Sequence, residues 1–153
     1  MEPRRTPTPP AAGDHVLRFP GTTAGLDDAV KALRAILDAR PLTPRRRHDV
    51  ELVFEEVASN IVNYGKPTGD VEAAIGFGGE TVLTFTDDGV SFDPRQQPPP
   101  PAAARRQDLR IGGLGLVIVR DICTRIDYVR TPDDRNRLTL HIPLADPAEL
   151  TNT

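Results

Sequence analysis

A long amphipathic helix is predicted between Thr43 and about Tyr64, and such a helix needs a second layer to pack against. Thr43 is suited to cap this helix, Pro44 suits its first position, and Gly65 ends it. At about 100° per residue, its apolar side chains gather on one stripe: Val50, Val53, Phe54, Val57, Ile61 and Tyr64. A helix with one apolar stripe is stable only when that stripe is buried, so the rest of the chain must supply a matching surface.

Short segments of alternating apolar residues predict the strands of that surface, at 16–20, 71–77, 81–86, 126–130 and 138–142. Two more helices are predicted, over residues 24–40 and from 116 to about 124. The helices therefore fall between pairs of strands that short turns join. This order indicates an α+β fold, a two-layer sandwich of helices on a sheet.

Proline-rich segments mark the parts that are not expected to join this core. Residues 1–13 hold four prolines and show no hydrophobic periodicity, so we expect a disordered tail there and a second tail at 146–153. Five more prolines lie between Pro94 and Pro101, within a segment at about 93–111 that predicts an inserted mobile loop. A polyproline run that binds a partner domain is the alternative. Residues 14–145 are left as one domain.

Charge and cysteine content exclude several classes of function. The chain has 19 Lys and Arg against 22 Asp and Glu, a formal net charge of −3, which argues against nucleic acid or an anionic membrane as the partner. No apolar run reaches the roughly 18 residues of a membrane span. Cys123 is the only cysteine, and no Cys/His cluster has the spacing of a metal site. We therefore expect a cytoplasmic protein with no direct contact to nucleic acid.

Polar residues form a second stripe along the edge of the apolar stripe of the predicted helix. Glu56, Asn60 and Asn63 are spaced i, i+4, i+7, so they lie on successive turns of one helix face. A carboxylate in this place can accept a proton, and an amide oxygen suits a hard cation such as Mg²⁺. The alternative is that these residues are the solvated side of an amphipathic helix.

An aspartate and a glycine follow the third predicted strand. Asp87 precedes Gly89 by two positions, which allows a flat ligand to approach the backbone and to bond to the carboxylate. The alternative is a plain Asp-Gly turn.

Three glycines precede the third predicted helix. Gly112, Gly113 and Gly115 leave backbone N–H groups exposed near a helix N-terminus, where phosphate binds well. Arg110, just upstream, is close enough in sequence to reach such a phosphate. The alternative is a flexible joint between loop and helix.

Taken together, these segments resemble the Bergerat-fold ATPases, the superfamily of gyrase and of histidine-kinase catalytic domains. The ordered motifs that carry the likeness are Glu56-x-x-x-Asn60, Asp87-x-Gly89 and Gly112-Gly113-x-Gly115-Leu116. Within this superfamily, the chain most resembles the anti-sigma-factor serine/threonine kinases, which are also single domains. The likeness covers about residues 15–144. The resemblance implies a mostly antiparallel, mixed sheet with the helices on one face.

The resemblance also implies a role for each candidate residue. Glu56 would be the catalytic general base, and Asn60 would hold Mg²⁺ against the phosphates of ATP. Asp87 would bind the adenine amino group, with Gly89 allowing the close approach, and the loop 93–111 would be the ATP lid. Further nucleotide contacts are expected from Asn63, Arg110, Gly112, Gly113, Leu114, Gly115 and Leu116.

The resembled kinases transfer the γ-phosphoryl group of ATP to a serine or threonine of a STAS-domain antagonist. They commonly also bind a sigma factor and often form homodimers. The alternative for this chain is a nucleotide-gated binding module that sequesters a sigma factor or another partner without phosphoryl transfer.

The chain departs from the pattern of the resembled family at three positions. Ser91 stands where many members have a second glycine, and Tyr64 stands where a histidine is usual. Near Asn136 the Gly-Thr that commonly precedes the last strand is missing, which affects one contact expected on the adenine side.

Overall fold

A computed structural model describes residues 15–91, 93, 95 and 112–143. The expected tails at 1–13 and 146–153, Arg110 and nearly all of the expected lid at 93–111 lie outside the described residues.

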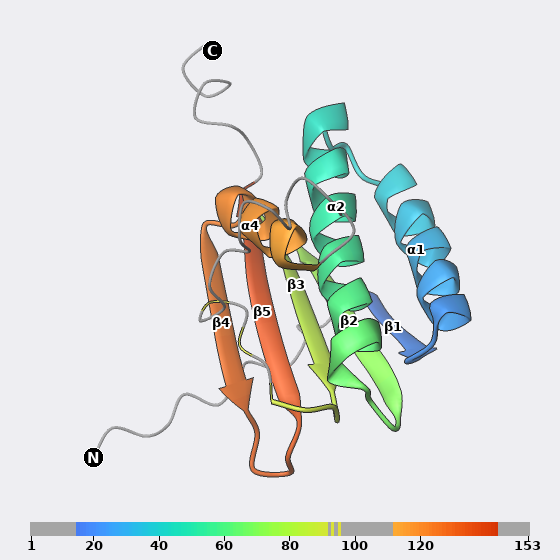
Figure 1. The fold of residues 1–153 in the computed structure, drawn as a ribbon. Coiled ribbons are helices and arrows are strands. Elements are labelled where there is room, and N and C mark those ends of the chain that lie inside the picture. Colours follow the sequence, from blue (N-terminus) through green and yellow to red (C-terminus); the bar gives the residue numbers. More distant parts are fainter. Residues whose placement is uncertain (1–14, 92, 94, 96–111, 144–153) are drawn as a thin grey trace.

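The described chain forms one sheet with its helices on a single face (Figure 1). The strand order is β1-β2-β3-β5-β4, and all four pairings between neighbouring strands are antiparallel. The elements are β1 (His15–Pro20), α1 (Thr23–Asp38), α2 (Pro44–Asn60), the π-helical turn η1 (Ile61–Gly65), β2 (Asp70–Phe77), β3 (Glu80–Asp87), α4 (Gly112–Ile122), β4 (Arg125–Arg130) and β5 (Asn136–Pro143). The predicted two-layer α+β sandwich is therefore confirmed, with an antiparallel sheet.

Two elements, α4 and β5, begin two or more residues earlier than the sequence predicted. Helix α4 starts at Gly112 instead of residue 116, since its packing against α2 outweighs the low helix propensity of the glycines. Strand β5 starts at Asn136 instead of residue 138, because Asn136 continues the pairing of β5 with both β3 and β4.

The core lies between α2 and the sheet. Phe54 of α2 is fully buried, with its ring centroid 6.5 Å from that of Phe19 on β1 and 5.2 Å from that of Phe85 on β3. The predicted N-cap of α2 is confirmed, since the Thr43 side chain accepts a hydrogen bond from the backbone N–H of Arg46.

The predicted apolar stripe is wrong at its end, where Tyr64 is 52% exposed. Helix α2 ends at Asn60, and the chain continues as the π-helical turn η1. A π-turn holds more residues per turn than an α-helix, so the side chains that follow Asn60 are rotated away from the faces that a period of 3.6 residues assigns to them.

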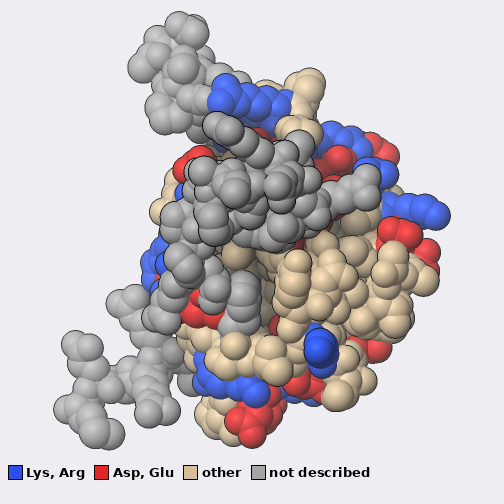
Figure 2. Space-filling model, viewed as in Figure 1, with Lys and Arg blue, Asp and Glu red and all other residues tan. Residues whose placement is uncertain are grey.

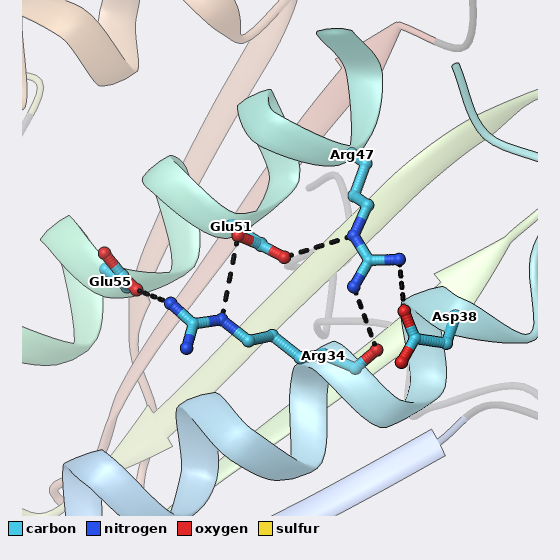
Figure 3. A network of polar contacts seen from close by, with 5 residues as sticks. All are labelled: Arg34, Asp38, Arg47, Glu51 and Glu55. Atoms are coloured by element: carbon cyan, nitrogen blue, oxygen red, sulfur yellow. Dashed lines mark hydrogen bonds and ion pairs between the residues drawn. The ribbon is translucent and has the colours of Figure 1, made fainter. Parts of the chain in front are cut away.

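The outer sides of α1 and α2 are joined by a network of ion pairs (Figure 3). Arg47 pairs with Asp38 and Glu51, and its Nη2 donates to the carbonyl of Arg34 at 3.4 Å. Arg34 in turn pairs with two glutamates of α2: its Nε lies 3.8 Å from Oε2 of Glu51, and its Nη2 lies 3.5 Å from Oε1 of Glu55. Exposed pairs of this kind add little stability each. The network links residues of α1 to residues of α2 along their outer sides.

Basic and acidic side chains are interspersed on the face shown in Figure 2, with no broad area of one sign among the described residues there. This distribution agrees with the small net charge of −3. Within the described ranges no helix has the length and apolar character that a membrane span requires.

Candidate functional site

A pocket lies where α2, η1 and α4 meet the ends of β3, β4 and β5. Its walls are mostly apolar and come from Val57, Ile61, Val90, Leu116 and Leu138. Four polar side chains also line it: Asn60, Asp87, Tyr128 and Asn136. An apolar pocket with a few convergent polar groups is the usual form of a site for a small organic ligand.

Asp87, the last residue of β3, is the acidic group of this pocket and is only 3% exposed. Its Oδ1 accepts hydrogen bonds from the backbone N–H of Gly89 at 2.8 Å and from Nδ2 of Asn136 at 3.2 Å. Burial raises the pKa of Asp87, while these two hydrogen bonds act in the opposite direction. Among the described residues no hydrogen bond reaches Oδ2, so this oxygen can accept one from a ligand.

Gly89 lies directly against the end of η1. A Cβ at this position would be 2.3 Å from the carbonyl oxygen of Gly65, and the next residue, Val90, donates its N–H to that same oxygen at 2.9 Å. The lack of a side chain at Gly89 is therefore what allows the loop after β3 to close one side of the pocket.

Replacing Gly89 by alanine is expected to lower the free energy of unfolding by about 1–3 kcal/mol, because the new Cβ meets backbone atoms that cannot rotate away. Urea denaturation of wild type and variant measures this change. Gly78→Ala is the matched control, since a Cβ there meets no atom within 4 Å. Equal losses in the two variants would contradict the steric explanation.

Asn60 and Glu56 come from the same face of α2 but differ in their surroundings. Asn60 lines the pocket and is 6% exposed, and its buried Nδ2 has no hydrogen-bond partner within the described part of the chain. Such an unpaired buried amide is costly unless a ligand completes it. Glu56, one turn earlier, is partly buried and does not line the pocket. Burial and, secondarily, the charge of Glu55 raise the pKa of Glu56.

Asn63, the third member of the predicted polar stripe, is exposed and lies away from the pocket. Its Nδ2 donates to Oγ of Ser59 at 3.1 Å, and it belongs to η1. The change from α-helix to π-helical turn after Asn60 is the physical reason, because it rotates Asn63 away from the line of Glu56 and Asn60.

The glycine segment forms the first turn of α4. Gly112, Gly113 and Gly115 therefore belong to the helix itself, together with Leu114. Leu116, in the next turn, is 6% exposed and contributes to the apolar wall of the pocket. Arg110 lies outside the described residues.

Sequence reasoning missed two residues of the site, Tyr128 and Arg130, and treated Asn136 only as a departure from a family pattern. Asn136 is the cross-strand partner of Asp87 on one side and of Arg130 on the other. Arg130 reaches under the loop after β3, donating from Nη1 to the carbonyl of Gly89 at 2.7 Å. One sequence signal could have found Asn136. Every second residue from Leu138 to Ile142 is apolar and buried, and Asn136 continues this alternation toward the start of β5.

Comparison with known proteins identifies the family. The model of the histidine kinase-like ATPase domain matches residues 19–142. No curated protein sequence matches the chain.

Two solved structures share the fold at low sequence identity. The RsbU and RsbW domains of a Mycobacterium tuberculosis protein match with a TM-score of 0.62 and 17% identity, over 94% of this chain and 34% of that one. This chain thus spans about a third of that structure. The SiaB–SiaC complex from Pseudomonas aeruginosa matches with a TM-score of 0.54 and 20% identity, over 84% of this chain and 88% of that one. The family match spans most of the sequence and agrees with the observed sheet and helices, so this chain belongs to the histidine kinase-like ATPase domain family.

Proposed function

We propose that this protein is an ATP-dependent serine/threonine protein kinase that acts on a STAS-domain antagonist in a partner-switching pathway of the cytoplasm. The observation that carries the nucleotide part of this proposal is the buried carboxylate of Asp87 in a mostly apolar pocket. One of its oxygens has no hydrogen bond from the described residues. That combination suits a flat base with an exocyclic amino group.

Adenine would lie in the apolar part of the pocket, with its amino group donating to Oδ2 of Asp87. The phosphates would then extend toward the first turn of α4, where Gly112, Gly113 and Gly115 stand at the N-terminal end of the helix. Backbone N–H groups and the helix dipole favour phosphate at such a place. Arg110 belongs to the proposal as a further phosphate contact from the expected lid.

The residues of the pocket also fit a magnesium ion held together with the nucleotide. The described residues contain no group of three or more His, Cys, Asp or Glu side chains that could hold a metal on their own. Mg²⁺ commonly takes only one or two protein ligands and completes its shell with substrate phosphates and water. Asn60 would hold it through its side-chain oxygen, and the buried Nδ2, which has no hydrogen-bond partner among the described residues, would donate to a phosphate oxygen. Bound there, the ion would neutralise phosphate charge.

Glu56 is the proposed general base. The hydroxyl oxygen of the substrate serine or threonine would form a bond to the γ-phosphorus while the bond to the β–γ bridging oxygen breaks, and ADP would leave. Glu56 would take the hydroxyl proton. A raised pKa suits this task, because a stronger base accepts the proton more readily.

The proposed partners follow from the family resemblance and from the complexes of similar folds. One chain of the SiaB–SiaC complex matches most of this chain at 20% identity, and that structure holds two different proteins together. A single domain of this size can therefore present a surface to a second protein. A STAS-domain antagonist as substrate, a sigma factor as a second partner and a homodimer are the further parts of this proposal.

The second candidate function is a nucleotide-gated binding module that sequesters a sigma factor or another partner and transfers nothing. The position of Glu56 favours it, since Glu56 does not line the pocket in the described structure.

A labelling experiment distinguishes the two functions. The purified protein is incubated with Mg²⁺ and γ-labelled ATP, with and without a STAS-domain protein from the same genome. Label on a serine or threonine of that protein is the result expected of the kinase. Nucleotide binding without transfer supports the binding module, and no nucleotide binding contradicts both.

A further inference from the structure

We propose that Asn136 positions Asp87 for adenine recognition and thereby sets the base specificity of the pocket. This inference rests on the proposed function and names residues that determine which nucleotide the site accepts. It starts from a row of three residues at the end of the sheet.

Asp87, Asn136 and Arg130 are direct cross-strand neighbours on β3, β5 and β4. Side chains directly opposite one another on antiparallel strands are close enough to interact. Asn136 is 6% exposed and lies between the carboxylate on one side and the guanidinium on the other. Its amide is thus enclosed between an acceptor and a donor.

The surroundings of Asn136 allow only one orientation of its amide. Nδ2 donates to Oδ1 of Asp87 at 3.2 Å and approaches the carbonyl oxygens of Gly89 and Val90 at 3.3 and 2.9 Å. Oδ1 accepts from the Tyr128 hydroxyl at 2.5 Å and from Nη1 of Arg130 at 3.1 Å. Carbonyls only accept and a guanidinium only donates, so a flipped amide would face like groups on both sides.

The hydrogen bonds run in one direction and end at Asp87. Tyr128 has a single hydroxyl hydrogen, which Asn136 accepts, so the 2.9 Å contact between Tyr128 and Ser91 has the Ser91 hydroxyl as donor. Ser91 thus donates to Tyr128, Tyr128 to Asn136, and Asn136 to Asp87. Two of the positions that depart from the resembled family, Ser91 and Asn136, are joined through Tyr128.

This arrangement occupies one oxygen of Asp87 and leaves the other as an acceptor. Oδ1 already accepts from Gly89 and Asn136, so a base can bond only to Oδ2. Adenine presents an amino group, which donates, whereas hypoxanthine presents a carbonyl at the same ring position and would face the carboxylate with a like group. Base discrimination therefore depends on Asp87 being held in place and ionised.

Asn136 supports the ionised form of Asp87 as well as its position. Its hydrogen bond lowers the pKa of Asp87 against the opposing effect of burial. The other charges that act on this carboxyl are Asp88, which raises its pKa, and Arg130, which lowers it. Without the amide of Asn136, protonation of Asp87 reaches higher pH, and a protonated carboxyl can donate to the carbonyl of hypoxanthine.

The test is calorimetric titration of Asn136→Ala with ADP and with IDP, from mildly acidic to neutral pH. We expect about tenfold weaker ADP binding and a smaller preference for ADP over IDP. We also expect the loss of ADP affinity on acidification to begin at a higher pH than in the wild type. Tyr128→Phe, which keeps the ring and removes only the hydroxyl, is expected to change all three in the same direction but less. Thr139→Ala, on the opposite face of β5, should behave as wild type.

Each result bears on one of the two proposals. Weaker binding with an unchanged ADP preference and an unchanged pH limb would mean that Asn136 is only structural, which overturns this inference and leaves the proposed function intact. Wild-type protein that binds neither ADP nor ATP would overturn both. If Asn136→Ala fails to fold, Tyr128→Phe decides on the same two measurements.

Discussion

Replacing Asp87 by asparagine is expected to reduce nucleotide affinity by about 100-fold or more while leaving the fold at least as stable as the wild type. The amide keeps the shape of the carboxylate and still offers an oxygen to the N–H of Gly89. Its nitrogen then stands where Oδ2 was, so two donors, this amide and the adenine amino group, face each other. Calorimetric titration with ADP measures the loss.

The expected gain in stability follows from the sign of the pKa shift of Asp87. Burial raises this pKa above its ordinary value of 3.8, so the folded state binds the proton more tightly than the unfolded chain does. The free energy of unfolding therefore falls as the pH rises through the ordinary carboxyl range up to the folded pKa. Asparagine carries no such cost at neutral pH, and urea denaturation at acidic and neutral pH measures the difference.

Asp88→Asn is the matched control, because the neighbouring carboxylate has the opposite shift. Asp88 accepts hydrogen bonds from Thr68 and from the backbone of Gly69, and these lower its pKa. Its contribution to stability is thus present at neutral pH and is lost as the pH falls through the folded pKa. We expect Asp88→Asn to destabilise the fold and to retain nucleotide binding. Normal ADP binding by Asp87→Asn would instead refute adenine recognition by Asp87.

The sequence was sufficient to predict the elements whose signals are local. The stripe of Val50, Val53, Phe54 and Val57 follows the period of an α-helix, and all four side chains are buried. The same period failed beyond Asn60, since no residue pattern announces a π-helical turn. Asn63 and Tyr64 were therefore assigned to faces that they do not occupy.

The candidate site was predictable only where its residues are close in sequence. Asp87 and Gly89 form a recognisable motif, and the structure shows what the motif does, namely to bring the loop onto Gly65. Asn136 lies 49 residues further on and meets Asp87 only through the register of β3 and β5. Such a pairing depends on the whole sheet, so the alternation along β5 can indicate that Asn136 faces inward but not that it meets Asp87.

Replacing Glu56 by glutamine is expected to slow phosphoryl transfer by about 10²–10⁴-fold and to leave ADP affinity unchanged. The amide has the size of the carboxylate but cannot take the proton of the attacking hydroxyl. Burial and Glu55 raise the pKa of Glu56 above 4.5, so transfer by the wild type should fall as the pH drops through that raised pKa. Single-turnover transfer of label from ATP to the STAS-domain protein, followed across pH, measures both effects.

Glu55→Gln is the control that distinguishes the loss of a general base from the loss of a negative charge on α2. Glu55 lies beside Glu56, pairs with Arg34 at 3.5 Å on the outer side of α2, and does not line the pocket. Its charge helps to raise the pKa of Glu56, so removing that charge should keep transfer active and move the acidic limb to lower pH. Transfer that survives in Glu56→Gln at the wild-type rate would exclude Glu56 as the base, because the isosteric amide cannot accept the proton.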